Sequence, residues 1–256
     1  MDLLRHPGYA IASANVVASL EQIDAVALLT NSDPPFFWST APVCRSVIYM
    51  SGRVGWLCDI DAAPEDRVQR GIALRLRAIQ GMDRIPSAVS ESYRREIYDD
   101  IVHQAERWDV YTRTTDEGLP TKIGDVNVPP DGGLVKLLLG DSFGQQVHFL
   151  LAGYSHGDLG LIGASLQDVE AHGLTKPHPS ELILQSGTVT IPTVLAFTEA
   201  FRQYAGLMGW WPEWKSSDSY LFERAIELVG QLEPLAEKQI EAFETARSKV
   251  APWAAD

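Results

Sequence analysis

The sequence has few of the features that would place it in a membrane. No run of about 18 consecutive apolar residues is present. The most apolar segment, residues 10–29, carries Glu21 and Asp24. The first residues lack the basic start and apolar centre of a signal peptide. We therefore expect a soluble, cytoplasmic protein with no membrane partner.

Cysteine is scarce, which limits disulfide and metal chemistry. The chain has 2 cysteines, Cys44 and Cys58, and both fall in one predicted helix. At about 1.5 Å of rise per residue they lie roughly 20 Å apart, too far to form a disulfide. Neither belongs to a Cys-x-x-Cys pair or another metal-binding spacing. We interpret both as small core residues, and the sequence names no metal ligand and no cofactor.

Basic residues are outnumbered. The chain has 34 acidic and 21 basic residues, for a net charge of −13 with histidine neutral. Such a charge repels nucleic-acid backbones and anionic membranes, so nucleic acid is an unlikely partner. The length of 256 residues suits one hydrophobic core, and we expect a single helical domain over residues 1–256.

Strand patterns and repeats are also missing, whereas apolar residues recur at helical spacing. The pattern predicts an all-α fold, an irregular bundle of about seven to nine helices. Residues 8–209 would form its core and residues 216–249 a long C-terminal helix. The other predicted helices cover residues 8–30, 40–59, 64–82, 87–114, 134–139, 145–155 and 191–208, with a short strand considered at 126–128 and loops at 116–133 and 171–187.

Three charged residues interrupt apolar helix faces. Arg45 and Arg75 fall on predicted core-facing stripes, and Asp24 falls on the flank of a third. One interpretation is a guanidinium-lined pocket for a carboxylate or phosphate, because arginine offers two parallel donors. The other is an internal salt-bridge network in which Arg45 pairs with Asp24 or Asp59. Both interpretations remain open.

His156 is the candidate catalytic residue, within the glycine-flanked segment Gly153–Gly157. A neutral imidazole can act as a general base near pH 7. Ser155 is its chain neighbour and faces another direction on a helix, so the two do not form a nucleophile–base pair. Alternatively, His156 is a core residue bonded to a carbonyl or to one of the arginines.

These residues together suggest an internal polar pocket that binds a small anionic or polar ligand. Whether the protein is an enzyme stays open. The predicted ligand-binding residues, besides the candidate catalytic His156, are Arg45, Tyr49, Arg75, Tyr154 and Ser155.

An acidic turn offers a different function. The spacings Asp99-x3-His103 and Asp100-x2-His103 resemble those of helical metal sites and would suit a metal-dependent oxygenase. However, Ile101 and Trp108 mark the inner face of this helix and place His103 on the opposite side. A solvated acidic face is the competing interpretation.

Two further clusters have a functional and a structural interpretation. Arg67, Arg70, Arg77 and Arg84 would form an RNA-binding face or a set of solvated ion pairs. The tryptophans at 210, 211 and 214 would form a homodimer contact or a helix corner packed into the core.

Two segments carry a resemblance to known proteins. The first includes Cys-Arg-Ser-Val-Ile-Tyr at 44–49, Trp-Leu-Cys-Asp at 56–59 and Arg-Val-Gln-Arg at 67–70, and the second is residues 149–157. They resemble a helical protein family common in actinobacteria and are distantly similar to HEPN proteins. That resemblance implies a nucleic-acid-acting or toxin and defence protein as an alternative function.

The chain departs from both patterns. The actinobacterial family carries an acid four residues after the arginine, where this chain has Tyr49. The HEPN catalytic signature is an arginine followed by four to six residues and a histidine. Arg95 and His103 are separated by seven residues, so the resemblance does not imply RNase activity.

Overall fold

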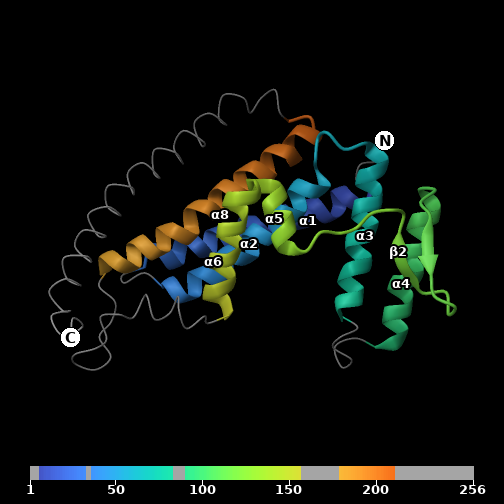
Figure 1. Cartoon of the computed structure of the whole chain (residues 1–256), viewed down its shortest axis with the longest axis horizontal. Helices are drawn as coiled ribbons and strands as arrows, with labels where there is room; N and C mark the ends of the chain where they lie inside the picture. Colours follow the sequence, from blue (N-terminus) through green and yellow to red (C-terminus); the bar gives the residue numbers. More distant parts are fainter. Residues whose placement is uncertain (1–5, 33–35, 83–89, 157–178, 211–256) are drawn as a thin grey trace, which may run out of the picture. The chain divides into compact units, whose positions relative to one another are not determined.

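The computed structural model describes residues 6–32, 36–82, 90–156 and 179–210. Within these residues the chain forms seven helices and one two-stranded hairpin, which confirms the all-α prediction. Figure 1 follows the elements from α1 in blue to α8 in orange. They are α1 (Pro7–Thr30), α2 (Phe37–Leu57), α3 (Pro64–Met82), α4 (Glu91–Arg107), β1 (Thr112–Thr114), β2 (Pro120–Ile123), α5 (Asp131–Leu139), α6 (Asp141–His156) and α8 (Pro179–Leu207).

Helix α4 ends earlier than its sequence pattern predicts. The helix closes at Trp108, and Asp109 follows with a φ of 53°, a left-handed conformation that helical residues do not adopt. The chain then forms the antiparallel pair β1–β2 instead of the predicted helical turns up to residue 114. The short strand considered at residues 126–128 is therefore wrong. The strands precede it.

Helix α8 begins about three turns earlier than predicted. It starts at Pro179, within the loop predicted over residues 171–187, whereas the sequence predicted a start at residue 191. A proline is tolerated at the first position of a helix and also, at some cost, inside one. Pro179 and Pro192 occupy these two positions in α8. The predicted C-terminal helix, residues 216–249, lies outside the described residues.

The chain divides into two compact units. The first contains Met1–Leu20, Tyr49–Gln145 and Glu199–Trp211. The second contains Glu21–Ile48, Gln146–Thr198 and Pro212–Asp256. Several helices contribute residues to both units. The single domain proposed from the sequence stays a prediction.

The first unit is built around α3. Ile72 and Ile79 lie on its buried side with Ile101 of α4 and Ile123 of β2. Figure 1 shows α3, α4 and the hairpin side by side, and residue contacts join all three. A second cluster joins the start of α1 to the end of α2. Its buried members are Ala12, Val16, Val54, Leu57, Cys58, Leu74, Ala200 and Tyr204.

The second unit buries one side of α2. Phe37, Ala41, Cys44, Val47 and Ile48 are all at most 1% exposed. Their spacing of three and four residues is that of a single helical face. The prediction that both cysteines are core residues is confirmed, because Cys44 and Cys58 are free and buried. Burial raises the pKa of Cys44, and raises that of Cys58 to about 12, so both thiols stay protonated at neutral pH.

Helix α1 is apolar on more than one side. Val16 is buried, whereas Leu20 is 48% exposed and Leu28 is 76% exposed. Within the described residues, α1 is the one helix long and apolar enough to span a membrane, with a mean hydropathy of 1.3. Core helices and signal sequences have the same length and composition, so this is weak evidence for a membrane span.

Candidate functional site

Arg45 and His156 form the contact on which the candidate site is built. Arg45 lies in the middle of α2, and His156 is the last residue of α6. Nη1 of Arg45 lies 3.0 Å from Nε2 of His156. A guanidinium has only donors, so Nε2 must accept this hydrogen bond. The imidazole is therefore neutral and carries its proton on Nδ1.

The contact lies at the protein surface instead of in an internal pocket. Arg45 is half-buried and His156 is exposed. The predicted partners of Arg45 are also elsewhere, because Asp24 is exposed and Asp59 accepts a bond from Arg70. The buried face of α2 passes through Cys44. The next residue, Arg45, is turned by about 100° and falls on the flank of that face.

An aromatic cluster occupies the same two helices. The Tyr154 ring of α6 meets Phe37 edge to face, with ring centroids 4.8 Å apart, and lies 6.1 Å from the Trp38 ring. Phe37 and Trp38 are themselves 5.2 Å apart. Phe37 is buried, whereas Trp38 is 40% exposed. The last turn of α6 thus brings Tyr154 to the aromatic cluster and His156 to Arg45.

Two other predicted ligand-binding residues lie close to these along the chain. Ser155 is between Tyr154 and His156, and its hydroxyl oxygen is buried without a hydrogen-bond partner in the described structure. Tyr49 lies one turn after Arg45 on α2 and is half-buried. Ser155 therefore retains an unused donor and acceptor beside the Arg45–His156 contact.

Arg75, the remaining predicted ligand-binding residue, does not point into a core. It belongs to the first unit, and its Nη2 lies 2.7 Å from a carboxylate oxygen of Asp100 on α4. The Arg75 side chain is 29% exposed and that of Asp100 48% exposed. The inward direction predicted for Arg75 is wrong because its long side chain leaves the buried stripe of α3 and reaches the surface of α4.

The acidic turn of α4 is a solvated face, in line with the second interpretation above. Asp99, Asp100 and His103 are all exposed. Asp100 accepts hydrogen bonds from Arg75 and Gln104. In the described part of the chain, no group of three or more His, Cys, Asp or Glu side chains could hold a metal ion.

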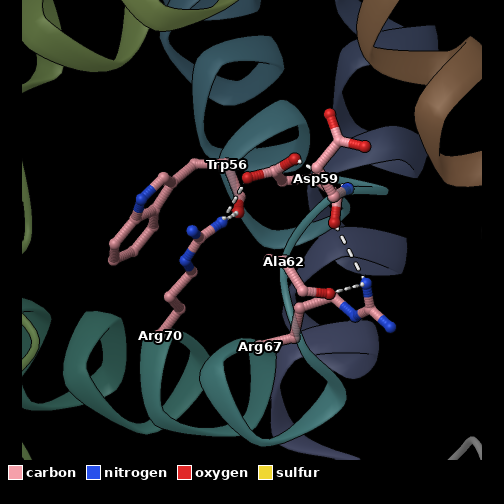
Figure 2. Close-up of polar contacts among 6 residues, drawn as sticks. Trp56, Asp59, Ala62, Arg67 and Arg70 are labelled. Atoms are coloured by element: carbon pink, nitrogen blue, oxygen red, sulfur yellow. Dashed lines mark hydrogen bonds and ion pairs between the residues drawn. The ribbon is translucent and has the colours of Figure 1, made fainter.

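The arginines predicted to be solvated instead close the corner between α2 and α3 (Figure 2). Arg67 is 7% exposed, and its Nη1 donates to the backbone carbonyls of Asp59 and Ala62 at 3.0 and 2.7 Å. Arg70 donates to the carbonyl of Trp56 at 2.6 Å and to the carboxylate of Asp59 at 3.1 Å. Its guanidinium carbon also lies 5.3 Å from the centre of the Trp56 indole.

The bond from Arg70 satisfies a carbonyl that the end of α2 leaves open, and the bonds from Arg67 go to carbonyls of the loop between α2 and α3. Arg77 does the same for a loop, since it donates to the carbonyls of Val128 and Pro129. Sequence reasoning missed this role. The available signal was the position of Arg67 and Arg70 in the first turns of a helix that follows a short corner after α2.

The tryptophan cluster is only partly described. Trp210 is 48% exposed and lies edge to face with Tyr204, whose hydroxyl is 2.8 Å from that of Ser13. Trp211 and Trp214 lie outside the described residues. The homodimer contact considered for this cluster stays a prediction.

Comparison of the chain with protein-family profiles, curated proteins and solved structures finds no match.

Proposed function

We propose that this chain binds a small anionic or polar ligand at an accessible site formed by Arg45 and His156. The observation that supports this proposal is the 3.0 Å hydrogen bond between the guanidinium of Arg45 and Nε2 of His156. A guanidinium has five N–H donors and holds a full positive charge at every physiological pH. Beside it, the neutral ring of His156 presents Nδ1–H as a further donor. Donors on two neighbouring groups suit a carboxylate or phosphate.

The same bond favours binding over catalysis. A general base needs a free lone pair, and the lone pair on Nε2 already accepts a hydrogen bond from the guanidinium of Arg45. His156 would have to break this bond before it could take a proton there. In the geometry observed, its role is to orient the guanidinium and to present Nδ1–H. We therefore assign His156 to ligand binding.

The net charge and the contacts of the arginines also bear on the class of partner. The net charge of −13 disfavours nucleic-acid partners and supports solubility. Arg67, Arg70 and Arg77 bind backbone carbonyls, so they add little to a nucleic-acid surface. We propose a cytoplasmic protein whose partner is a small molecule.

The direct test is an NMR titration of the protein with ¹⁵N-labelled histidine rings. Acetate and inorganic phosphate are added separately, and the His156 signals are assigned with His156→Gln. Either anion is expected to shift the ring nitrogens of His156 in a saturable way. Arg45→Gln should weaken binding by about tenfold or more, because a charge-assisted hydrogen bond is lost.

Arg113→Gln is the matched control, since Arg113 is an exposed arginine on β1 in the other unit. It removes the same charge and should leave the titration unchanged. An equal loss in Arg113→Gln would mean that the anions respond to net charge alone. If His156 does not respond to either anion, the proposed site is wrong. Saturable binding of a short RNA that survives Arg45→Gln would favour the nucleic-acid alternative.

A further inference from the structure

The surface around Arg45 combines donors with an exposed aromatic ring. Trp38 and Arg45 are both on α2, seven residues apart. Seven residues are close to two helical turns, so both project in nearly the same direction, with about 10 Å between them along the axis. Pro42 lies between them and is exposed. It carries a short ring and no charge, so the strip that joins Trp38 to Arg45 is apolar.

Helix α6 connects the two ends of this strip. Tyr154 lies 6.1 Å from the Trp38 ring, and His156 lies 3.0 Å from the Arg45 guanidinium. These two α6 residues are separated by one position, so the aromatic and the polar contacts are made by a single helical turn. Trp38 and Arg45 start about 10 Å apart along the α2 axis, so a ligand that touches both side chains must be long enough to lie along this strip.

Trp38 has the chemistry to take part in binding. Phe37, its neighbour, is 1% exposed, whereas Trp38 leaves 40% of its surface in water. Rings prefer edge-to-face or offset contacts with other rings, and an indole is the largest aromatic surface a side chain offers. The exposed part of Trp38 can thus accept one more ring.

We infer that the ligand is an aromatic acid whose carboxylate or phosphate group binds Arg45 and His156 while its ring packs against Trp38. This inference rests on the proposed function and adds the substrate class. Aliphatic acids satisfy the donors but make no ring contact with the exposed part of the Trp38 indole. Ring contacts of this kind add about three- to tenfold in affinity beyond the burial of apolar area.

The test compares three carboxylates by the same His156 titration. They are acetate, 3-cyclohexylpropionate and 3-phenylpropionate, which share the anionic group and differ in the attached group. The phenyl compound is expected to bind about tenfold more tightly than acetate and about threefold more tightly than the cyclohexyl compound. Phenyl phosphate and inorganic phosphate form a parallel pair that separates a phosphate ligand from a carboxylate ligand.

Two substitutions of Trp38 test whether its ring causes the preference for phenylpropionate. Trp38→Phe keeps a ring and should retain most of the preference for phenylpropionate. Trp38→Leu keeps apolar volume without a ring and should abolish it, while acetate binds as before. The melting midpoint of each variant shows that the fold is intact. Retained acetate binding also shows that the Arg45–His156 site persists.

The outcomes separate the two proposals. If acetate and both propionates bind equally, the aromatic preference is overturned and the proposed anion site stands. Equal affinity of the cyclohexyl and phenyl compounds overturns it as well, because the surface then recognises any apolar group. A preference that survives in Trp38→Leu places the ring elsewhere and overturns the assignment to Trp38. Failure of every anion to bind overturns the proposed function itself.

Discussion

The backbones of Gly71 on α3 and Gly8 on α1 are in direct contact. A Cβ atom built on Gly71 would lie 2.6 Å from the Cα of Gly8, closer than two carbon atoms can approach. The atoms nearest to this added Cβ belong to the backbone of Pro7 and Gly8, so they cannot rotate away as a side chain could. The close crossing of α1 and α3 at this point therefore requires glycine at position 71.

Gly71→Ala should destabilise the protein by about 2–3 kcal/mol or more, because one helix must move away from the other. Gly81→Ala is the matched control on the same helix, where an added Cβ meets nothing within 4 Å. That change should stabilise by up to about 1 kcal/mol through helix propensity. Urea unfolding of both variants measures the difference. Equal midpoints would show that the crossing is looser than described.

The second prediction concerns the corner between α2 and α3. Arg67→Met should cost about 1–3 kcal/mol, because the carbonyl of Ala62 loses its donor and that of Asp59 keeps only the backbone N–H of Ala62. Arg113→Met, at an exposed position, should change stability by less than about 0.5 kcal/mol. A wild-type midpoint for Arg67→Met in urea would mean that water replaces the guanidinium at no cost.

This corner also shows where sequence reasoning stops. Helical periodicity predicts the existence of α2 and α3 because their apolar residues recur every three to four positions. It treats Arg67 as a surface residue, since the apolar pattern does not show where the carbonyls of a loop point. The carbonyls that Arg67 binds belong to Asp59 and Ala62, in the loop between α2 and α3. Only the folded corner brings them within reach of a long, flexible side chain.

The candidate site illustrates the same limit. The sequence singled out both Arg45 and His156, 111 positions apart, and the structure joins them by a hydrogen bond. It did not predict their exposure. A helix that is apolar on most sides gives no clear direction to a charged residue such as Arg45, and a shift of one position turns a side chain by about 100°. The ring contact between Trp38 and Tyr154 was not apparent either, because the two residues are distant in sequence.

The third prediction concerns the end of α4. Asp109 has a φ of 53°, which suits glycine better than a residue with a Cβ. Asp109→Gly should raise the free energy of unfolding by about 0.5–1 kcal/mol. Asp116→Gly lies in the hairpin loop without a positive φ and should not stabilise the protein. Thermal melts of the two variants test this. A lower midpoint for Asp109→Gly would mean that its side chain contributes more than the strain costs.

The fourth prediction is a pH dependence that originates at His6. This residue is 0% exposed and stacks on Tyr9 with ring centroids 4.1 Å apart. Burial lowers the pKa of His6, and the positive charge of Arg67 lowers it further. Below about pH 6.5, His6 binds a proton in the unfolded chain but stays neutral in the folded protein until the pH reaches its lowered pKa. Stability should therefore fall as the pH drops from 6.5 towards the lowered pKa.

Denaturant unfolding between pH 7 and pH 5 measures this slope, which is at most about 1.4 kcal/mol per pH unit for one proton. His6→Phe should flatten the curve in this interval, because phenylalanine keeps the stacking and binds no proton. His103→Gln removes an exposed histidine and should leave the slope unchanged. A slope that persists in His6→Phe would assign the proton uptake to another group.

The last prediction separates a surface site from a buried ion pair at Arg45. Removal of one partner of a buried pair costs about 3–5 kcal/mol, because the other charge is left without compensation. The ring of His156, to which Arg45 donates, is exposed and can bond to water instead. Arg45→Met should therefore cost about 1 kcal/mol or less, while anion binding is lost. A double-mutant cycle with His156→Gln should give a coupling energy of similar size. A loss of several kcal/mol in Arg45→Met would show that the guanidinium stabilises the fold, and the binding role would then need evidence from the titrations alone.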